Sequence, residues 1–283
     1  MDPSLRGRVA IVAPCRLEAE RLRARLHVEE ARRHLGRPQW LGALGGLPVV
    51  VTECGISMVN AAIATQALLD RAQVEAVVVA GVAGGVAPAL GPGDVVVPAS
   101  WASYQESHLA RRAGDGWACD WSLMDFTNFG MMFPRPVFVA RAAVEDGQGG
   151  DGDDDDGDEV RFWFEVDPGL LAAARRAAGA GSCRVVLGGR GVSGAPFVDN
   201  LEFRDWLGQC FRAEVLDQET AAVAQTAHVN GVPFIAFRAV SDLAGGDEGA
   251  NPIEAQAGGA ADLAAAAIEA FCRELARARE AAA

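Results

Sequence analysis

The sequence predicts an α/β fold: a single domain with a mixed central β-sheet flanked by helices on both sides. Valine- and isoleucine-rich runs of strand length alternate with helical segments along most of the 283 residues. Continuous apolar strands indicate a sheet that is covered on both faces. Half of the residues are hydrophobic, which is enough for one large core. We therefore expect residues 1–283 to form one domain.

The first 100 residues supply strands and helices in alternation. Apolar runs of strand length occur at 8–14, 48–53, 75–81 and 93–100, with helical segments at 17–35 and 57–72. The strand at 75–81 leads into GVAGG at 81–85, whose glycines would let a ligand approach backbone N–H groups closely. This stretch lacks the G-x-G-x-x-G spacing, so a dinucleotide site is disfavoured.

Regular structure returns after an irregular region at about 101–160. Beyond it we predict helices at 168–180, 200–211 and 218–230, strands at 183–194 and 232–242, and a long C-terminal helix. Residues 145–159 consist only of Asp, Glu, Gly and one Gln, which predicts a disordered acidic insertion. A calcium site there is disfavoured because the spacing does not follow an EF-hand loop.

Charge and cysteine usage exclude several classes of partner. The formal net charge of −13 argues against binding to nucleic acid or anionic membranes, which needs basic patches. No apolar stretch is long enough to span a membrane, and no signal peptide is visible. The six scattered cysteines indicate free thiols, and we expect a cytoplasmic protein. Cysteines and histidines show no metal-ligand spacing, so neither a metal site nor a cofactor is expected.

Three side chains stand beside strand ends or helix starts. Asp242 ends the apolar strand 232–242, Glu219 begins an otherwise apolar helix, and Phe197 lies beside a glycine turn. Ligands of open α/β sheets bind at the carboxyl ends of strands, which favours a site at Asp242. Each residue also has a simpler explanation: a turn cap, a carboxylate favoured at a helix N-terminus, or a core phenylalanine. The residues alone leave both interpretations open.

Four stretches together resemble one family. They are GVAGGVAPALGPGDVVVP, GVSGAPFVDN, DQETAAVAQ and VPFIAFRAVSDLAGG, in this order. They resemble the purine nucleoside phosphorylase and nucleosidase superfamily, most closely methylthioadenosine/S-adenosylhomocysteine nucleosidases and plant bark (vegetative) storage proteins. The resemblance covers roughly residues 8–100 and 160–275. It implies a nucleoside phosphorylase-like fold, a purine nucleoside as substrate, and a homo-oligomer, of which a dimer is favoured.

The resemblance also implies roles for the matching residues. Asp242 would protonate the purine N7 and Glu18 would activate water, so these two are the expected catalytic residues. The spacing also allows Glu20, but Glu18 keeps the leucine four residues on. Glu219 would hold the ribose hydroxyls and Phe197 would stack on the base. The other expected substrate-binding residues are Val198, Gln218 (a methionine in the family), Ser241, Ala83 and Gly84.

The chemistry of N-glycosidic cleavage needs these residue types, because positive charge builds on the ribose and negative charge on the leaving base. Hydrolysis is favoured: APCRLEAE holds a carboxylate where nucleosidases keep their base, and lacks the glycine-proline-arginine phosphate loop of hexameric phosphorylases. Phosphorolysis of purine or cytokinin ribosides, with phosphate as co-substrate, is the alternative; Arg16, Arg190 and Arg238 are its possible ligands. A storage protein on the same fold is the other. Residues 101–140 are expected to line the 5′ end of the pocket.

Overall fold

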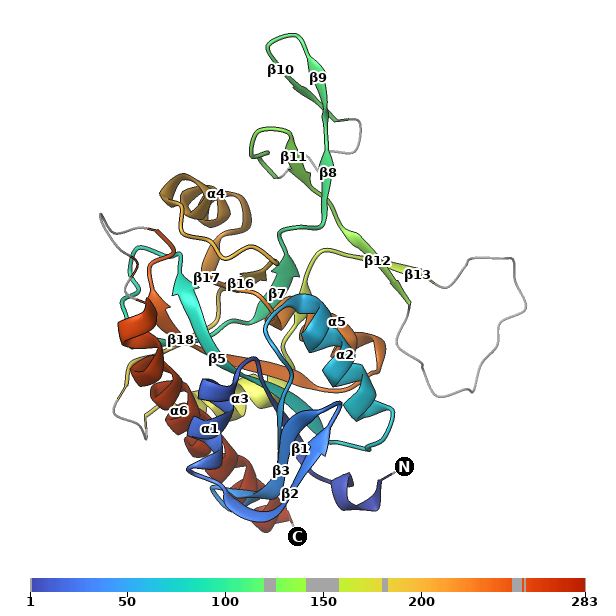
Figure 1. Ribbon diagram of the computed structural model, residues 1–283, viewed down its shortest axis with the longest axis vertical. Helices are drawn as coiled ribbons and strands as arrows, with labels where there is room; N and C mark the ends of the chain where they lie inside the picture. The colour runs from blue at the N-terminus through green and yellow to red at the C-terminus, as the bar shows by residue number, and fades with distance from the viewer. Residues whose placement is uncertain are drawn as a thin grey trace, which may run out of the picture.

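A computed structural model describes residues 2–119, 126–140, 158–179, 183–245, 251 and 253–282 (Figure 1). Its centre is a 12-stranded sheet, built around the largely buried strands β1 (Val9–Ala13), β4 (Leu47–Glu53), β5 (Ala76–Gly85) and β18 (Phe234–Asp242). The other strands of this sheet are β2 (His27–His34), β3 (Arg37–Leu44), β6 (Val95–Val97), β7 (Ser100–Ser103), β14 (Phe164–Glu165), β15 (Val185–Leu187), β16 (Arg190–Ser193) and β17 (Ala213–Asp217).

The strands pair in both senses. Parallel pairing joins β5 to β1 and β18, β1 to β4, and β16 to both β7 and β17. Antiparallel pairing joins β17 to β5, and β3 to both β4 and β2. The predicted mixed sheet is therefore confirmed. The parallel strands β18, β5, β1 and β4 are largely buried, and the antiparallel pair β17–β5 joins them to the parallel strands β7, β16 and β17.

Helices cover both faces of the sheet (Figure 1). On one side α1 (Arg16–Arg23) and α3 (Pro168–Ala177) pack against the long α6 (Ile253–Ala282). On the other side α2 (Met58–Leu69) packs against α5 (Thr220–Val229). Helix α4 (Leu201–Phe211) lies against β16 and β17. A short 3-10 helix, η1 (Pro3–Leu5), precedes β1. Within the described ranges, no helix combines the length and apolarity needed to cross a bilayer.

Strand β5 runs through the GVAGG stretch instead of ending before it. Its first residues pair with β1, while Gly84 and Gly85 pair with β17. A Cβ atom on Gly81 would lie 2.3 Å from Nη1 of Arg238 and 2.5 Å from Oε1 of Glu18. Gly81 therefore makes room for two buried charged side chains, whereas Val82, Ala83 and Gly84 of the same stretch line a pocket, so a close approach of a ligand to this stretch stays a prediction.

The predicted helix at 17–35 is also wrong in its second half. Helix α1 ends at Arg23, and residues 27–34 form β2. The close pairing of β2 with β3 depends on Gly42, where a Cβ atom would lie 2.1 Å from the carbonyl oxygen of His27. Because β2 is an exposed edge strand, its charged residues lack the apolar alternation that marks a strand.

Short antiparallel ribbons replace the irregular region. They are β8 (Ser107–Leu109) with β11 (Met132–Pro134), β9 (Arg111–Ala113) with β10 (Gly116–Ala118), and β12 (Val137–Ala140) with β13 (Asp158–Arg161). These ribbons project from the body of the molecule (Figure 1). Of the predicted acidic insertion at 145–159, residues 145–157 lie outside the described residues. Asp158 and Glu159 belong to β13, so the predicted boundary at 159 is wrong.

Candidate active site

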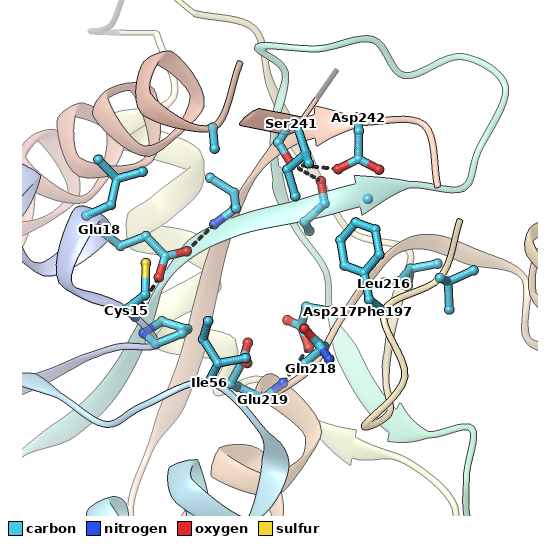
Figure 2. Close-up of a pocket in the computed structure, with 18 of the residues that line it drawn as sticks. Cys15, Glu18, Ile56, Phe197, Leu216, Asp217, Gln218, Glu219, Ser241 and Asp242 are labelled. Atoms are coloured by element: carbon cyan, nitrogen blue, oxygen red, sulfur yellow. Dashed lines mark hydrogen bonds between the residues drawn. The ribbon is translucent and has the colours of Figure 1, made fainter. Parts of the chain in front are cut away.

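A pocket of about 260 Å³ lies at the carboxyl ends of the central strands (Figure 2). Its wall is formed by the segment after β1, the last part of β5, the ends of β17 and β18, and the loop after β16. This is the place where open α/β sheets bind ligands. Its polar lining residues are Cys15, Glu18, Asp217, Gln218, Glu219, Ser241 and Asp242.

Glu18 lies in the first turn of α1 and is only 5% exposed. Its Oε2 accepts a hydrogen bond from the N–H of Cys15 at 2.9 Å, and its Oε1 accepts one from the N–H of Val82 at 2.9 Å. Burial raises the pKa of Glu18, while the charge of Arg238 and the two N–H groups oppose the increase. A fixed carboxylate with a raised pKa is suited to take a proton from water near neutral pH.

Arg238 lies in the middle of β18 and is fully buried. Its Nε lies 2.8 Å from Oδ2 of Asp217 and donates to the hydroxyl of Thr220 at 3.0 Å. Its Nη2 lies 3.2 Å from Oε2 of Glu219, and its Nη1 donates to the carbonyl of Val82 at 3.3 Å. One guanidinium therefore neutralises two buried carboxylates, without which their burial would be costly.

Glu219 occupies the N-cap position of α5 without a capping side-chain hydrogen bond and is 4% exposed. Its Oε1 accepts a hydrogen bond at 3.0 Å from the N–H of Ser57, whose φ of 103° is rare for a residue other than glycine. Burial raises the pKa of Glu219 to about 7, although Arg238 acts in the opposite direction. Each carboxylate oxygen keeps a second lone pair that can accept a hydrogen bond from a ligand hydroxyl.

Asp242 ends β18 beside Ser241. Its Oδ1 accepts a hydrogen bond from the N–H of Ala244 at 2.9 Å, and its Oδ2 lies 2.8 Å from the hydroxyl oxygen of Ser241. That hydroxyl also lies 3.4 Å from the carbonyl oxygen of Ala83. Figure 2 shows Asp242 and Phe197 on the side of the pocket opposite Glu18. The carboxylates of Glu18 and Asp242 therefore lie on opposite sides of the pocket.

The remainder of the wall is mostly apolar. Phe197 is 53% exposed and Val198 is buried, both in the loop after β16. Gln218 stands between Asp217 and Glu219 in the sequence, where β17 leads into α5. Its Nε2 donates a hydrogen bond to the carbonyl oxygen of Ala195, in the loop after β16. Further apolar contacts come from Leu17, Ile56, Ile253 and Ala257. A planar apolar ring and a small apolar group would both find partners here.

All nine residues predicted for the site line this one pocket. The structure brings together Glu18, Ala83, Gly84, Phe197, Val198, Gln218, Glu219, Ser241 and Asp242. Their catalytic and binding roles stay predictions. Glu20, the alternative to Glu18, points elsewhere: it is exposed and pairs with Arg16 at 2.8 Å.

The three arginines considered for phosphate do not line the pocket. Arg238 is fully buried and forms ion pairs with Asp217 and Glu219. The guanidinium of Arg190 lies 4.6 Å from the ring centroid of Trp163. Arg16 is exposed and pairs with Glu20. The expectation that residues 101–140 line the 5′ end is wrong for the described part of that segment, which contributes nothing to the pocket wall.

Sequence reasoning missed the ionic network behind the pocket. Asp217 and Ser57 were not singled out, and Arg238 was considered only as a phosphate ligand. A signal existed: Arg238 is the single charged residue inside the apolar run VPFIAFRAV, and a charge in a buried strand requires a partner. The identity of that partner depends on the fold, since Asp217 belongs to another strand.

The fold and the pocket define an α/β protein with a partly apolar small-molecule site that carries buried carboxylates. The chain belongs to the phosphorylase superfamily, whose family model matches residues 8–277. The family inferred from the sequence motifs is therefore confirmed.

Relatives within this family are nucleosidases. The chain is 29% identical to the 5′-methylthioadenosine/S-adenosylhomocysteine nucleosidase of Chromohalobacter salexigens, over 84% of this chain and 85% of that protein. It is 28% identical to the nucleosidase of the same name from Bacillus thuringiensis, over 84% of this chain and 87% of that protein. The plant storage-protein likeness finds no support among these relatives, which are bacterial nucleosidases.

Solved structures show the same fold. The nucleosidase of Neisseria meningitidis in complex with methylthio-immucillin-A superimposes with a TM-score of 0.70 at 26% identity, covering 94% of this chain and 98% of that one. The futalosine hydrolase of Helicobacter pylori superimposes with a TM-score of 0.70 at 20% identity, covering 95% of this chain and 98% of that one. The second likeness concerns the fold alone.

Proposed function

We propose that this protein hydrolyses the N-glycosidic bond of a purine nucleoside of the 5′-methylthioadenosine/S-adenosylhomocysteine type. The observation that carries the proposal is the convergence of Glu18, Glu219 and Asp242 on one pocket. The nucleosidase relatives support the same reaction. Hydrolysis uses the nucleoside and water, and no cofactor is required.

Each carboxylate has a separate task in the proposed reaction. The base lies between Phe197 and Asp242, and Asp242 gives a proton to the departing purine at N7. Glu219 accepts hydrogen bonds from the ribose 2′- and 3′-hydroxyls, and its negative charge favours the cationic ribosyl ring. Glu18 takes a proton from the water that attacks the anomeric carbon. A positioned acid and base each contribute roughly 10²–10⁴-fold to the rate.

The pocket favours water over phosphate as the nucleophile. Within the described part of the chain, no arginine lines the pocket, and the sequence contains no lysine. A phosphate dianion is usually held by arginine and by backbone N–H groups. Here two N–H groups near the pocket already donate to Glu18, so they hold a carboxylate instead of an anion from solution.

The oligomer is proposed to be a homodimer. Ile56, Val59 and Ile63 lie at or near the start of α2, and each is more than half exposed. Val59 and Ile63, four residues apart, lie on one side of α2, and Ile56 comes just before the helix. This apolar surface borders the pocket through Ile56, and contact with a second copy would remove it from water. Sedimentation of Val59→Glu against the wild type tests this assembly; a mass unchanged from that of a wild-type dimer would contradict it.

A cytoplasmic location completes the proposal. All six cysteines are unpaired, as expected in a reducing compartment.

The substrate class is tested by base release from methylthioadenosine, S-adenosylhomocysteine, adenosine and inosine. We expect adenine from the first two at a kcat/KM well above that for inosine, because the apolar residues Leu17 and Ile56 suit a 5′-thioether. Glu219→Gln, tested in parallel, separates this reaction from contaminating activity. If no nucleoside were cleaved, the storage-protein alternative would replace the proposal.

A further inference from the structure

The loop that carries Phe197 is held by two glutamine side chains from different parts of the chain. We define the Phe197 loop as residues 194–198. The N–H of Ala195 donates to Oε1 of Gln105 at 2.5 Å. The carbonyl oxygen of Ala195 accepts from Nε2 of Gln218 at 2.5 Å. Both backbone groups of one residue are therefore bound by side-chain amides.

Hydrogen bonds also hold the backbone at or next to each of the two glutamines. The N–H of Gln105 donates to the hydroxyl of Ser103 at 3.3 Å, and its carbonyl accepts from the hydroxyl of Ser107 at 3.2 Å. Gln218 follows Asp217, whose carboxylate accepts from the backbone N–H groups of Glu219 and Thr220 at 3.1 and 3.0 Å.

The start of the loop leaves little freedom. A Cβ atom on Gly194 would lie 2.2 Å from the ring of Tyr104, so the backbone rests directly on that buried ring. The hydroxyl of Tyr104 donates to the carbonyl of Pro196 at 3.3 Å. Phe197 itself is 53% exposed and receives little support from packing. Its position therefore depends on the backbone contacts of Ala195 and Pro196.

We propose that Gln105 and Gln218 are positioning residues that clamp Ala195 and so hold Phe197 against the purine base. The inference rests on the proposed function for the identity of the ligand. It gives a use to Gln218, which replaces the methionine of the family motif: a methionine cannot donate to the carbonyl of Ala195. The clamp also connects the pocket to the ribbon that begins at β8, since Gln105 lies in the turn between β7 and β8.

The direction of each hydrogen bond provides a sharp test. Gln105 must accept, because a backbone N–H can only donate; Gln218 must donate, because a carbonyl can only accept. A glutamate at position 105 keeps an acceptor, whereas a glutamate at position 218 loses the donor and places a negative charge against the carbonyl. We therefore expect Gln105→Glu to retain the wild-type KM and Gln218→Glu to raise it.

Methionine at either position removes the hydrogen bond at nearly unchanged size. A neutral hydrogen bond has a net worth of about 0.5–1.5 kcal/mol, so Gln105→Met and Gln218→Met should each raise KM about 2- to 12-fold. The kcat should change little, because a contact to the base is made in both the ground and transition states. Gln209→Met, on the exposed side of α4, is the matched control.

Hydrogen exchange measured without substrate separates this inference from the proposed function. Amide exchange in residues 194–200 should accelerate in Gln105→Met and remain slow in Gln105→Glu and Gln209→Met. Unchanged exchange in Gln105→Met, or a KM of Gln105→Glu as high as that of Gln105→Met, would overturn the clamp. A wild type that cleaves no nucleoside would instead overturn the proposed function, and the exchange result would still decide whether Ala195 is clamped.

Discussion

The guanidinium of Arg238 and the carboxylate of Glu219 lie 3.2 Å apart between Nη2 and Oε2, with Arg238 fully buried behind the pocket. The arginine also lies 2.8 Å from Asp217 and does not line the pocket, so its charge is directed at these carboxylates and not at a ligand. Arg238 neutralises the negative charge of Asp217 and Glu219, two buried carboxylates that line the pocket. Loss of this one cation would leave two buried negative charges unpaired.

Arg238→Met should therefore destabilise the protein strongly. Breaking a buried ion pair from one side costs about 3–5 kcal/mol. Arg16→Met is the control, because the side chain of Arg16 is 80% exposed and its pair with Glu20 lies at the surface; a change within about 0.5 kcal/mol is expected. Urea unfolding of both variants gives the two free energies. Equal stability of Arg238→Met and wild type would show that the buried carboxylates do not depend on Arg238.

Glu219→Gln should lower kcat/KM far more than it lowers stability, because the amide keeps the shape but not the charge. Burial raises the pKa of Glu219 to about 7, and the ionised form is the one that binds hydroxyls and favours a cationic ring. Activity should therefore rise with pH as Glu219 loses its proton near pH 7, and Glu219→Gln should lack this ionisation. A pH profile of kcat/KM checks this. Cleavage of 2′,3′-dideoxynucleosides as fast as ribonucleosides would contradict the role.

Asp242→Asn should slow the chemical step by about 10²–10⁴-fold, the usual contribution of a positioned acid. The amide preserves size and can hydrogen-bond, but it has no carboxylic proton to give. Substrate affinity should change less, since the proton is needed mainly in the transition state. Single-turnover rates with Asp205→Asn as an exposed control provide the comparison. An unaffected single-turnover rate would remove Asp242 from the mechanism.

Glu18→Gln should abolish hydrolysis while leaving adenine binding detectable. Glu20→Gln, two residues along the same helix, should be nearly silent because Glu20 is exposed and does not line the pocket. Burial raises the pKa of Glu18 as well, so low pH should also inactivate the enzyme by protonating this base. Initial rates and adenine titrations of the two variants discriminate them. Loss of activity in Glu20→Gln alone would reassign the base.

Gly81→Ala should destabilise the protein and displace the side chains of Glu18 and Arg238. The added Cβ would lie 2.3 Å from Arg238 and 2.5 Å from Glu18, and overpacking of this kind costs about 1–3 kcal/mol. Gly91→Ala is the matched control, because a Cβ there meets nothing within 4 Å. Thermal unfolding and activity of both variants test the prediction. A fully active and stable Gly81→Ala would mean that Glu18 and Arg238 can move apart without consequence.

The local sequence was sufficient to predict the strands that are buried on both faces. The valine runs at β1, β4 and β5 and the apolar β18 were predicted because burial on both faces leaves a continuous apolar signal. The edge strand β2 was missed because its pairing with β3 is a tertiary feature, and its exposed charges resemble those of a helix. Asp242 was singled out because it ends an apolar strand, where open α/β sheets bind ligands, whereas Glu18 was identified through the resemblance to the nucleosidase family.

Relationships between distant side chains were beyond local sequence. The sequence around Gly81 does not predict that the side chains of Arg238 and Glu18 lie directly beside this glycine. Likewise, the hydrogen bonds from Gln105 and Gln218 to Ala195 join three segments that only the folded sheet brings together. The ion pair of Arg238 with Asp217 has the same origin, since strands β17 and β18 both pair with β5.

The sugar product of wild-type cleavage tests the central claim most directly. Methylthioadenosine is incubated with the enzyme in phosphate-free buffer and in buffer with inorganic phosphate, and the sugar is identified by mass spectrometry. Hydrolysis by Glu18-activated water predicts free methylthioribose and adenine at the same rate in both buffers. A sugar 1-phosphate that forms only with phosphate present would contradict the account and establish a phosphorylase.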